Sequence, residues 1–329
     1  MGQNLSRKRS LSAISSLIRV ASIFACCCLT VEAQSRRAVV LTTDVGAEMD
    51  DQWTLAHLAL APEIELRGVV TTHAPSLAAP AAETAARVAR EVLKHLPIRR
   101  HPPVFAGSSV PLARDGVAQK NPGVEFIIRE SRGFSPGHRL AVLVIGAATD
   151  LASALLLDPT LGERIEVIAM GFDDWTEGGD SWNVKNDPQA WRVLLASSAP
   201  ITIGDAKVTK RELAMTRRRA EKLFARHGEA GRYLVEELAK WLDRDPKFCR
   251  EVTGAPDTWI IWDEVATAHL LSLTQTVKRP RPALRDDLRF VPASPRDADR
   301  TIEWVVKIDG TGLWRHFADR LSVTNKAAH

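Results

Sequence analysis

The sequence has little cysteine and little net charge once its first 33 residues are set aside. Three of its four cysteines are Cys26–Cys28, which leaves Cys249 alone in the rest of the chain. A single cysteine can form neither an internal disulfide framework nor a cysteine-based zinc site. The chain is therefore expected to fold on its apolar core, and 45% of its residues are hydrophobic.

The first 33 residues have the features of an export signal. The basic residues Arg7–Arg9 precede a mostly apolar run, Ile18–Val31, which Arg19 interrupts. This run is too short and too broken for a comfortable membrane span. We expect export to the periplasm or the medium, cleavage near Ala33 and no stable membrane span. An uncleaved anchor and a lipoprotein attached at Cys26–Cys28 are the alternatives.

The same segment holds most of the net charge. Residues 1–33 contain four basic residues and one acidic residue, whereas the whole chain has a formal net charge of +4. The remainder therefore carries about +1 on ordinary charge states. A nearly neutral chain lacks the basic surface that attracts nucleic acid, so no nucleic-acid partner is expected.

Strand-like apolar runs alternate with helical stretches between residues 37 and 204. The predicted strands are Ala38–Thr43, Leu66–Thr72, Pro103–Ala106, Leu140–Gly146, Ile165–Gly171 and Pro200–Gly204, and the predicted helices are Asp50–Ala61, Ala79–His95 and Thr149–Leu157. A charged helical region at Lys210–Trp241, a strand at Thr301–Ile308 and a helix at Leu313–Leu321 follow. This alternation predicts an α/β fold, with a mostly parallel central sheet flanked by helices, in a single domain over residues 34–329.

The most informative stretch is a strand end followed by three aspartates. Val39–Thr43 leads directly into Asp44, a turn follows at Gly46, and Asp50 and Asp51 begin the next helix. Carboxylates this close repel one another unless a cation neutralises them. Hard oxygen ligands without a nearby cysteine favour Ca²⁺ or Mg²⁺ over zinc. Helix capping explains one of these aspartates but not all three.

Polar residues follow four of the predicted strands. They are Asp44, Thr72–His73, Gly146–Asp150 and Gly171–Asp174. Ligands of parallel sheets bind beyond the carboxyl ends of the strands. We therefore expect these four segments to converge on one crevice.

Taken in order, these motifs resemble the nucleoside hydrolase superfamily, and in particular a divergent, exported branch of it. The matching segments are Thr42–Gly46 with Asp50–Asp51, Pro103–Gly107, Gly146–Ala152, Trp182–Ala190 and Trp262–Ala266. The resemblance covers about residues 37–325, and its specificity comes from the collinear order of the motifs. It implies the Rossmann-like fold of that family, a nucleoside or related ribosyl substrate, and a homodimer or homotetramer.

The resemblance also implies a metal site and a catalytic base. A Ca²⁺ would be held by Asp44, Asp51, Asp263 and the backbone carbonyl of Thr149. Asp44 would be the general base that activates water to cleave an N-glycosidic bond, through a transition state with oxocarbenium character.

Five further residues are implied as substrate contacts. Asp50 would accept a hydrogen bond from a ribose hydroxyl, and Asn183 would contact the outer hydroxyls. Trp182 and Trp262 are candidates for stacking on the base. Ser76 stands roughly where the family has an asparagine.

The departures from the family pattern keep two other functions open. Ala47–Met49 lengthens the loop before the aspartate pair, Ser181 stands where a glutamate would hold the ribose, and Trp262 replaces a histidine that protonates the base in some members. These losses suit a secreted protein that binds a sugar or nucleoside without turnover. A phosphohydrolase of the haloacid dehalogenase type would need a nucleophilic aspartate where the chain has Thr42, two residues before Asp44.

Overall fold

The computed structural model describes residues 36–113, 116–179, 181–291 and 299–326. The predicted export signal lies outside these residues, so it stays a prediction. By their internal contacts, residues 36–329 form one unit. Among the described helices, none has both the length and the apolar character that crossing a bilayer requires.

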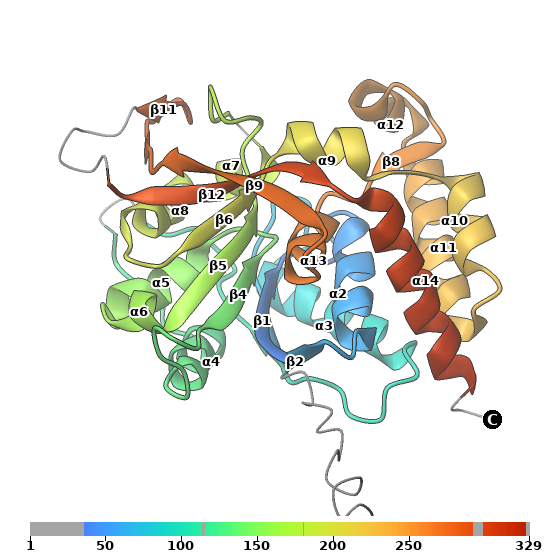
Figure 1. Cartoon of the computed structure of the whole chain (residues 1–329), viewed down its shortest axis with the longest axis horizontal. Helices are drawn as coiled ribbons and strands as arrows, with labels where there is room; N and C mark the ends of the chain where they lie inside the picture. The colour runs from blue at the N-terminus through green and yellow to red at the C-terminus, as the bar shows by residue number, and fades with distance from the viewer. Residues whose placement is uncertain (1–35, 114–115, 180, 292–298, 327–329) are drawn as a thin grey trace, which may run out of the picture. The chain divides into compact units, whose positions relative to one another are not determined.

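A sheet of eight strands forms the centre of the fold, in the order β3-β2-β1-β4-β5-β6-β12-β9 (Figure 1). The strands are β1 Arg37–Thr43, β2 Ile64–Thr71, β3 Val104–Ala106, β4 Leu140–Val144, β5 Ile165–Met170, β6 Ile201–Gly204, β9 Thr274–Pro280 and β12 Thr301–Ile308. Neighbours pair in parallel except β12 and β9, which are antiparallel. The predicted α/β class with a mostly parallel sheet is therefore confirmed, with β9 as an edge strand that we did not predict.

Helices cover both faces of this sheet. Helices α2, α3, α13 and α14 pack on one face, and α4, α5 and α8 pack on the other (Figure 1). The helices are α2 Asp50–Leu60, α3 Ala81–Lys94, α4 Pro122–Ser131, α5 Thr149–Leu157, α6 Leu161–Arg164, α7 Trp182–Asn186, α8 Pro188–Ala196, α9 Ala206–Glu212, α10 Arg217–Phe224, α11 Gly228–Arg244, α12 Pro246–Thr253, α13 Glu264–Leu270 and α14 Gly310–Lys326.

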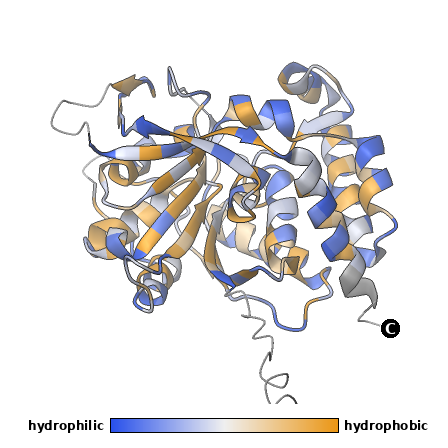
Figure 2. Cartoon of the chain, in the orientation of Figure 1, coloured by the Kyte–Doolittle hydropathy of each residue, from blue (hydrophilic) through white to orange (hydrophobic). Residues whose placement is uncertain are grey.

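Strand β1 shows why its sequence is continuously apolar. Val39 and Leu41 belong to the core on one face of the sheet, and Val40 belongs to the core on the other. Because each face is covered, no alternation with polar residues is needed. Figure 2 shows the same pattern, with hydrophobic colour along the central strands and hydrophilic residues on the outer helices. Asp44 directly follows this doubly covered strand and is itself buried.

Side-chain caps define where three helices begin. Asn121 accepts a hydrogen bond from the Val124 amide at 2.9 Å, and Asp187 accepts one from the Ala190 amide at 2.9 Å. Asp245 caps α12 in the same way, and each cap is followed by a proline. A capping side chain satisfies an otherwise unpaired amide, and proline suits the first helical position. The pair Asp187–Pro188 therefore begins a helix.

The charged region Lys210–Trp241 is not one continuous helix. Helices α9, α10 and α11 are separated by the short strand β7, Ala214–Thr216, which pairs antiparallel with β8, Thr258–Ile260. A further short pair, β10 Ala283–Leu284 and β11 Phe290–Val291, lies near the edge of the fold. The β7–β8 pair matters for function because β8 ends three residues before Asp263.

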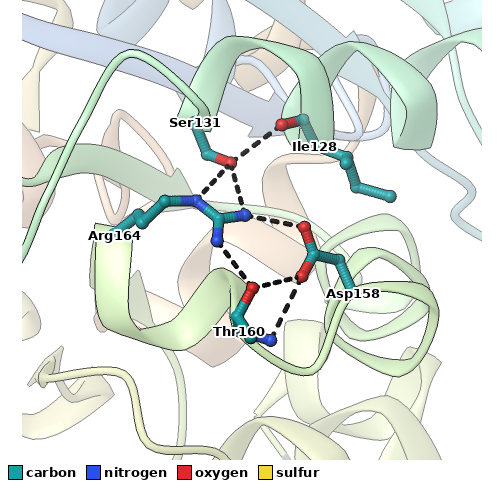
Figure 3. A network of polar contacts seen from close by, with 5 residues as sticks. All are labelled: Ile128, Ser131, Asp158, Thr160 and Arg164. Atoms are coloured by element: carbon teal, nitrogen blue, oxygen red, sulfur yellow. Dashed lines mark hydrogen bonds and ion pairs between the residues drawn. The ribbon is translucent and has the colours of Figure 1, made fainter.

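A polar network holds the opposite end of the sheet (Figure 3). The Arg164 guanidinium donates to Asp158 Oδ2 at 2.7 Å, to Thr160 Oγ1 at 2.7 Å and to Ser131 Oγ at 3.2 Å. These contacts join the end of α4 to the turn between α5 and α6, directly before β5. They lie at the amino ends of the parallel strands, away from the end where ligands bind.

Candidate active site

A cavity of about 320 Å³ opens at the carboxyl ends of β1, β4 and β5, and we call it the carboxyl-end cavity. Asp44, Ile145 and Met170 reach it from these three strands, and Asp173 follows β5 into it. The segment after β2, Thr72–His73, is buried but does not line the cavity. Of the four segments singled out in the sequence, Asp44 and Gly171–Asp174 therefore supply lining residues, whereas from the end of β4 it is Ile145, directly before Gly146–Asp150, that lines the cavity.

Besides Asp173, five carboxyl groups from two distant stretches of sequence line this cavity. They are Asp44, Glu48, Asp50, Asp51 and Asp263. Carboxylate oxygens of Asp50, Asp51 and Asp263 lie within 4.8 Å of one another. The predicted metal set contained Asp44, Asp51 and Asp263, so the geometry groups Asp51 with Asp263 as expected but adds Asp50 as the third member. Asp44 lines the same cavity outside this trio.

The local backbone brings these side chains together. Asp44 directly follows β1, and Gly46 at φ +98° makes the turn that leads to α2. Only glycine adopts this φ without strain. Asp50 and Asp51 lie in the first turn of α2, where acidic side chains suit the positive end of the helix. The Thr43 hydroxyl donates to Asp51 Oδ1 and orients that carboxylate.

A buried pair joins the two helices that carry the aspartates. His57 of α2 lies 2.9 Å from Glu264 of α13, and both side chains are 0% exposed. The other ring nitrogen of His57 lies 2.8 Å from His316 of α14. Asp263 directly precedes α13, and Asp50 and Asp51 begin α2. The pair therefore links the two helices whose starts carry these three carboxylates.

Burial is the main cause that raises the pKa of all five carboxyl groups. It raises the pKa of Asp44 and of Asp50 to about 7. For Asp51, Asp263 and Glu48, repulsion from neighbouring carboxylates adds to burial, and the pKa of each lies well above its usual value. Without a cation this cluster therefore binds protons at neutral pH.

The cluster fits a hard divalent cation. Asp44 Oδ2 and Asp50 Oδ1 are buried oxygens without a hydrogen-bond partner in the described part of the chain. No lysine, arginine or histidine is among the described residues that line the cavity. An unpaired buried carboxylate costs several kcal/mol, so such oxygens need a positive partner. A buried aspartate cluster that can bind a metal is thus present.

Besides Asp50, three of the predicted substrate residues line the cavity. They are Asn183, Trp182 and Trp262. The Asn183 amide nitrogen donates to the carbonyls of Ile145 at 3.1 Å and Met170 at 3.2 Å. Both amide hydrogens are therefore committed to the backbone, which leaves the amide oxygen to contact a ligand as an acceptor.

The structure places Thr149 and Ser76 elsewhere. Thr149 is fully buried, its hydroxyl donates to Asp187 Oδ2 at 2.6 Å, and it does not line the cavity. Its predicted metal contact through the backbone carbonyl stays a prediction. Ser76 is exposed in the turn Ala74–Leu77, closed by a backbone hydrogen bond of 3.1 Å. The expected substrate contact of Ser76 is not supported, because this turn keeps it outside the cavity.

Sequence reasoning missed one carboxylate and an aromatic wall. Glu48 lies in the lengthened loop and is half-buried at the cavity. Phe248 of α12 and Trp259 of β8 line the cavity together with Trp262. The Trp259 ring lies 5.6 Å from Phe248 and 6.5 Å from Trp262. Proximity to Asp50 was an available indication for Glu48, whereas no sequence pattern pointed to Phe248 or Trp259.

With this geometry in view, comparison with known families is informative. The profile of the family described as inosine-uridine preferring nucleoside hydrolase matches residues 39–315. The chain belongs to this family. It is therefore an N-ribohydrolase, and the expected resemblance is confirmed. A comparison with curated proteins found no match.

Solved structures agree on the fold. A purine-preferring ribonucleoside hydrolase from Gardnerella vaginalis has a TM-score of 0.71 at 20% identity, over 88% of this nucleoside hydrolase and 100% of that chain. A plant nucleoside hydrolase gives 0.69 at 18% identity, over 87% and 99%. An inosine-uridine preferring nucleoside hydrolase from Bacillus anthracis gives 0.66 at 18% identity, over 87% and 99%. The likeness thus extends over nearly the whole of each relative.

Proposed function

We propose that this nucleoside hydrolase cleaves the N-glycosidic bond of a nucleoside or related riboside in a Ca²⁺-dependent reaction with Asp44 as the general base. The observation that carries the proposal is the buried cluster at the carboxyl-end cavity. Its aspartates include two buried oxygens, Asp44 Oδ2 and Asp50 Oδ1, that have no hydrogen-bond partner among the described residues.

The ion would be held by Asp51 and Asp263, which both the sequence and the geometry select, with Asp50 as the third carboxylate. Oxygen donors of this kind favour Ca²⁺, which accepts six to eight oxygens in flexible geometry. When bound, such an ion orders the diol of the sugar and lowers the pKa of water.

Asp44 is suited to take the proton from the attacking water. It is 2% exposed, lines the cavity and has one oxygen, Oδ2, to which no described residue donates a hydrogen bond. The surrounding carboxylates would stabilise the positive charge that develops on the sugar as the bond to the base breaks. The amide oxygen of Asn183 can accept a hydrogen bond from a sugar hydroxyl.

The direct test is release of free base from a panel of purine and pyrimidine nucleosides, with and without a chelator. We expect chelation to abolish activity and Ca²⁺ to restore it. Asp51→Asn should lose the bound metal and lower kcat/KM by about 10²–10³, the range for removing one electrostatic stabiliser. Asp174→Asn, at a carboxylate outside the cavity, is the matched control and should change neither quantity.

Two results would contradict the proposal. Turnover that resists the chelator would show that the reaction does not need the metal. Calorimetric binding of a nucleoside without release of base would instead favour the non-catalytic binding protein.

We also propose that the protein is exported and cleaved near Ala33, on the strength of the basic start and apolar run in its first 33 residues. N-terminal sequencing of protein recovered outside the cytoplasm tests this. A product that begins at Met1 would contradict it.

A further inference from the structure

The charge of the carboxyl-end cavity has one sign. Six carboxyl-bearing residues line it, and no lysine or arginine is among its described lining residues. Arg244 approaches Glu48, but its guanidinium stacks on the Trp241 ring at 4.1 Å and does not line the cavity. One divalent cation neutralises two of these charges, so a bound substrate still meets an excess of negative charge.

Part of the cavity lining is aromatic. Trp262 is half-buried and Phe248 is 39% exposed, so both have surface to offer a ligand, and the buried Trp259 contacts both rings. The faces of these rings carry partial negative charge. They therefore attract a planar cation more strongly than a neutral ring of the same size.

The cavity also lacks the usual acid for the leaving base. Neither histidine, lysine, tyrosine nor cysteine is found among the residues described as lining it. A neutral purine or pyrimidine must take up a proton to leave well, so its departure is poorly assisted here. A base that already carries a positive charge at the glycosidic nitrogen needs no proton.

We propose that the carboxyl-end cavity is selective for ribosides with a cationic base, of the N-ribosylpyridinium class, and the proposal rests on the function proposed above. The bond between C1′ and nitrogen breaks, and its electron pair neutralises the positive nitrogen. Water forms the new C1′–O bond and gives one proton to Asp44. The products are ribose, a neutral pyridine and one proton released to solvent for each turnover.

The experiment compares four substrates on the intact enzyme with Ca²⁺. They are N-ribosylnicotinamide, its 5′-phosphate, inosine and 4-nitrophenyl β-D-riboside, whose neutral leaving group also needs no acid. We expect kcat/KM for N-ribosylnicotinamide to exceed that for inosine by at least about 100-fold, and pH-stat titration to show one proton per turnover. The 5′-phosphate should be a poor substrate because no lysine or arginine is among the described lining residues to pair with it.

Variants separate the aromatic wall from general effects. Trp262→Leu should raise KM for N-ribosylnicotinamide about tenfold, the range of a partly desolvated cation–aromatic contact, and should raise KM for the nitrophenyl riboside less. Trp262→Phe should keep most of the preference. Trp175→Leu removes a tryptophan that lies outside the cavity and should leave both substrates unchanged.

The outcomes distinguish this inference from the function on which it rests. Turnover of inosine or nitrophenyl riboside at rates equal to or above that of N-ribosylnicotinamide would overturn the preference and leave the hydrolase function standing. An equal effect of Trp262→Leu on N-ribosylnicotinamide and on the nitrophenyl riboside would show that the aromatic wall does not cause the preference. Failure to hydrolyse any of the four, together with no base release from the nucleoside panel above, would reject the proposed function itself.

Discussion

Replacing Gly146 by alanine tests whether the position of Asp44 controls catalysis. Gly146 follows β4 and lies against the start of the Asp44 loop. A Cβ atom at this position would lie 2.6 Å from the Asp44 amide nitrogen and 2.8 Å from Asp44 Oδ1. One of these contacts is with backbone, so a side-chain rotation alone cannot relieve it.

The size of the effect follows from these distances. Ordinary van der Waals contact begins near 3.4 Å, so Asp44 or β4 must shift by roughly 0.8 Å. A misplacement of about 1 Å can cost about 10²-fold in rate. Overpacking of a filled site typically costs about 1–3 kcal/mol of stability. We therefore expect Gly146→Ala to fold, with a lower melting temperature and kcat/KM reduced by about 10²-fold.

Gly137→Ala is the matched control, because a Cβ there would meet nothing within 4 Å. Both variants are assayed for base release and bound Ca²⁺ and followed by thermal unfolding. We expect Gly137→Ala to match the unchanged protein in all three. If Gly146→Ala retained kcat/KM within twofold, the position of Asp44 would not limit the reaction, and its role as base would lose its structural support.

Two further predictions concern the carboxylates and their helices. The metal-free protein should lose stability as pH rises from about 4 to above 7. The pKa of Asp44 and of Asp50 is about 7 in the folded state and has an ordinary value of 3.8. The folded state therefore binds more protons than the unfolded state in this pH range. Thermal unfolding should show Ca²⁺ stabilising the protein more at pH 8 than at pH 5, and an equal effect would contradict the proton–metal competition. His57→Leu should destabilise the fold by about 3–5 kcal/mol, because it leaves the Glu264 carboxylate buried without its partner. Adding Glu264→Met should recover most of that loss but not the Ca²⁺ affinity measured by calorimetry; full recovery of affinity would show that the pair does not set the ligand geometry.

The fold was largely predictable because its core strands are buried on both faces. The sequences of such strands are continuous runs of Val, Ile and Leu. The predicted strand Ala38–Thr43, which precedes Asp44, differs from β1 by one residue at its start. Strand β9 was missed because its residues are only partly buried, so Thr274–Pro280 has no apolar run. The break at Ala214–Thr216 was missed because β7 depends on pairing with β8, in which Trp259 lies 44 residues after its partner Met215, and local sequence does not encode such a pairing.

The aspartates of the site could be predicted from the sequence, whereas Phe248 and Trp259 of the aromatic wall could not, for a physical reason. Carboxylates are rarely buried without a charged partner. Three aspartates as close in the sequence as Asp44, Asp50 and Asp51, directly after a buried strand, therefore indicated a cation site. Aromatic residues are commonly buried for packing alone, so nothing set Phe248 and Trp259 apart from the other aromatic residues of the core. Only the folded structure, in which α12 and β8 lie at the cavity, distinguishes these two residues from the other aromatic residues.

By the resemblance described above, Ala47–Met49 lengthens the loop before the aspartate pair. Met49 is 2% exposed and packs in the core, so the added residues are anchored rather than looped out into solvent. That anchor turns Ala47 and Glu48 toward the carboxyl-end cavity, which both residues line. The loop therefore adds one carboxylate and one apolar surface beside the retained aspartates. We therefore expect a change in this loop to alter what the cavity accepts while Asp50, Asp51 and Asp263 stay in position.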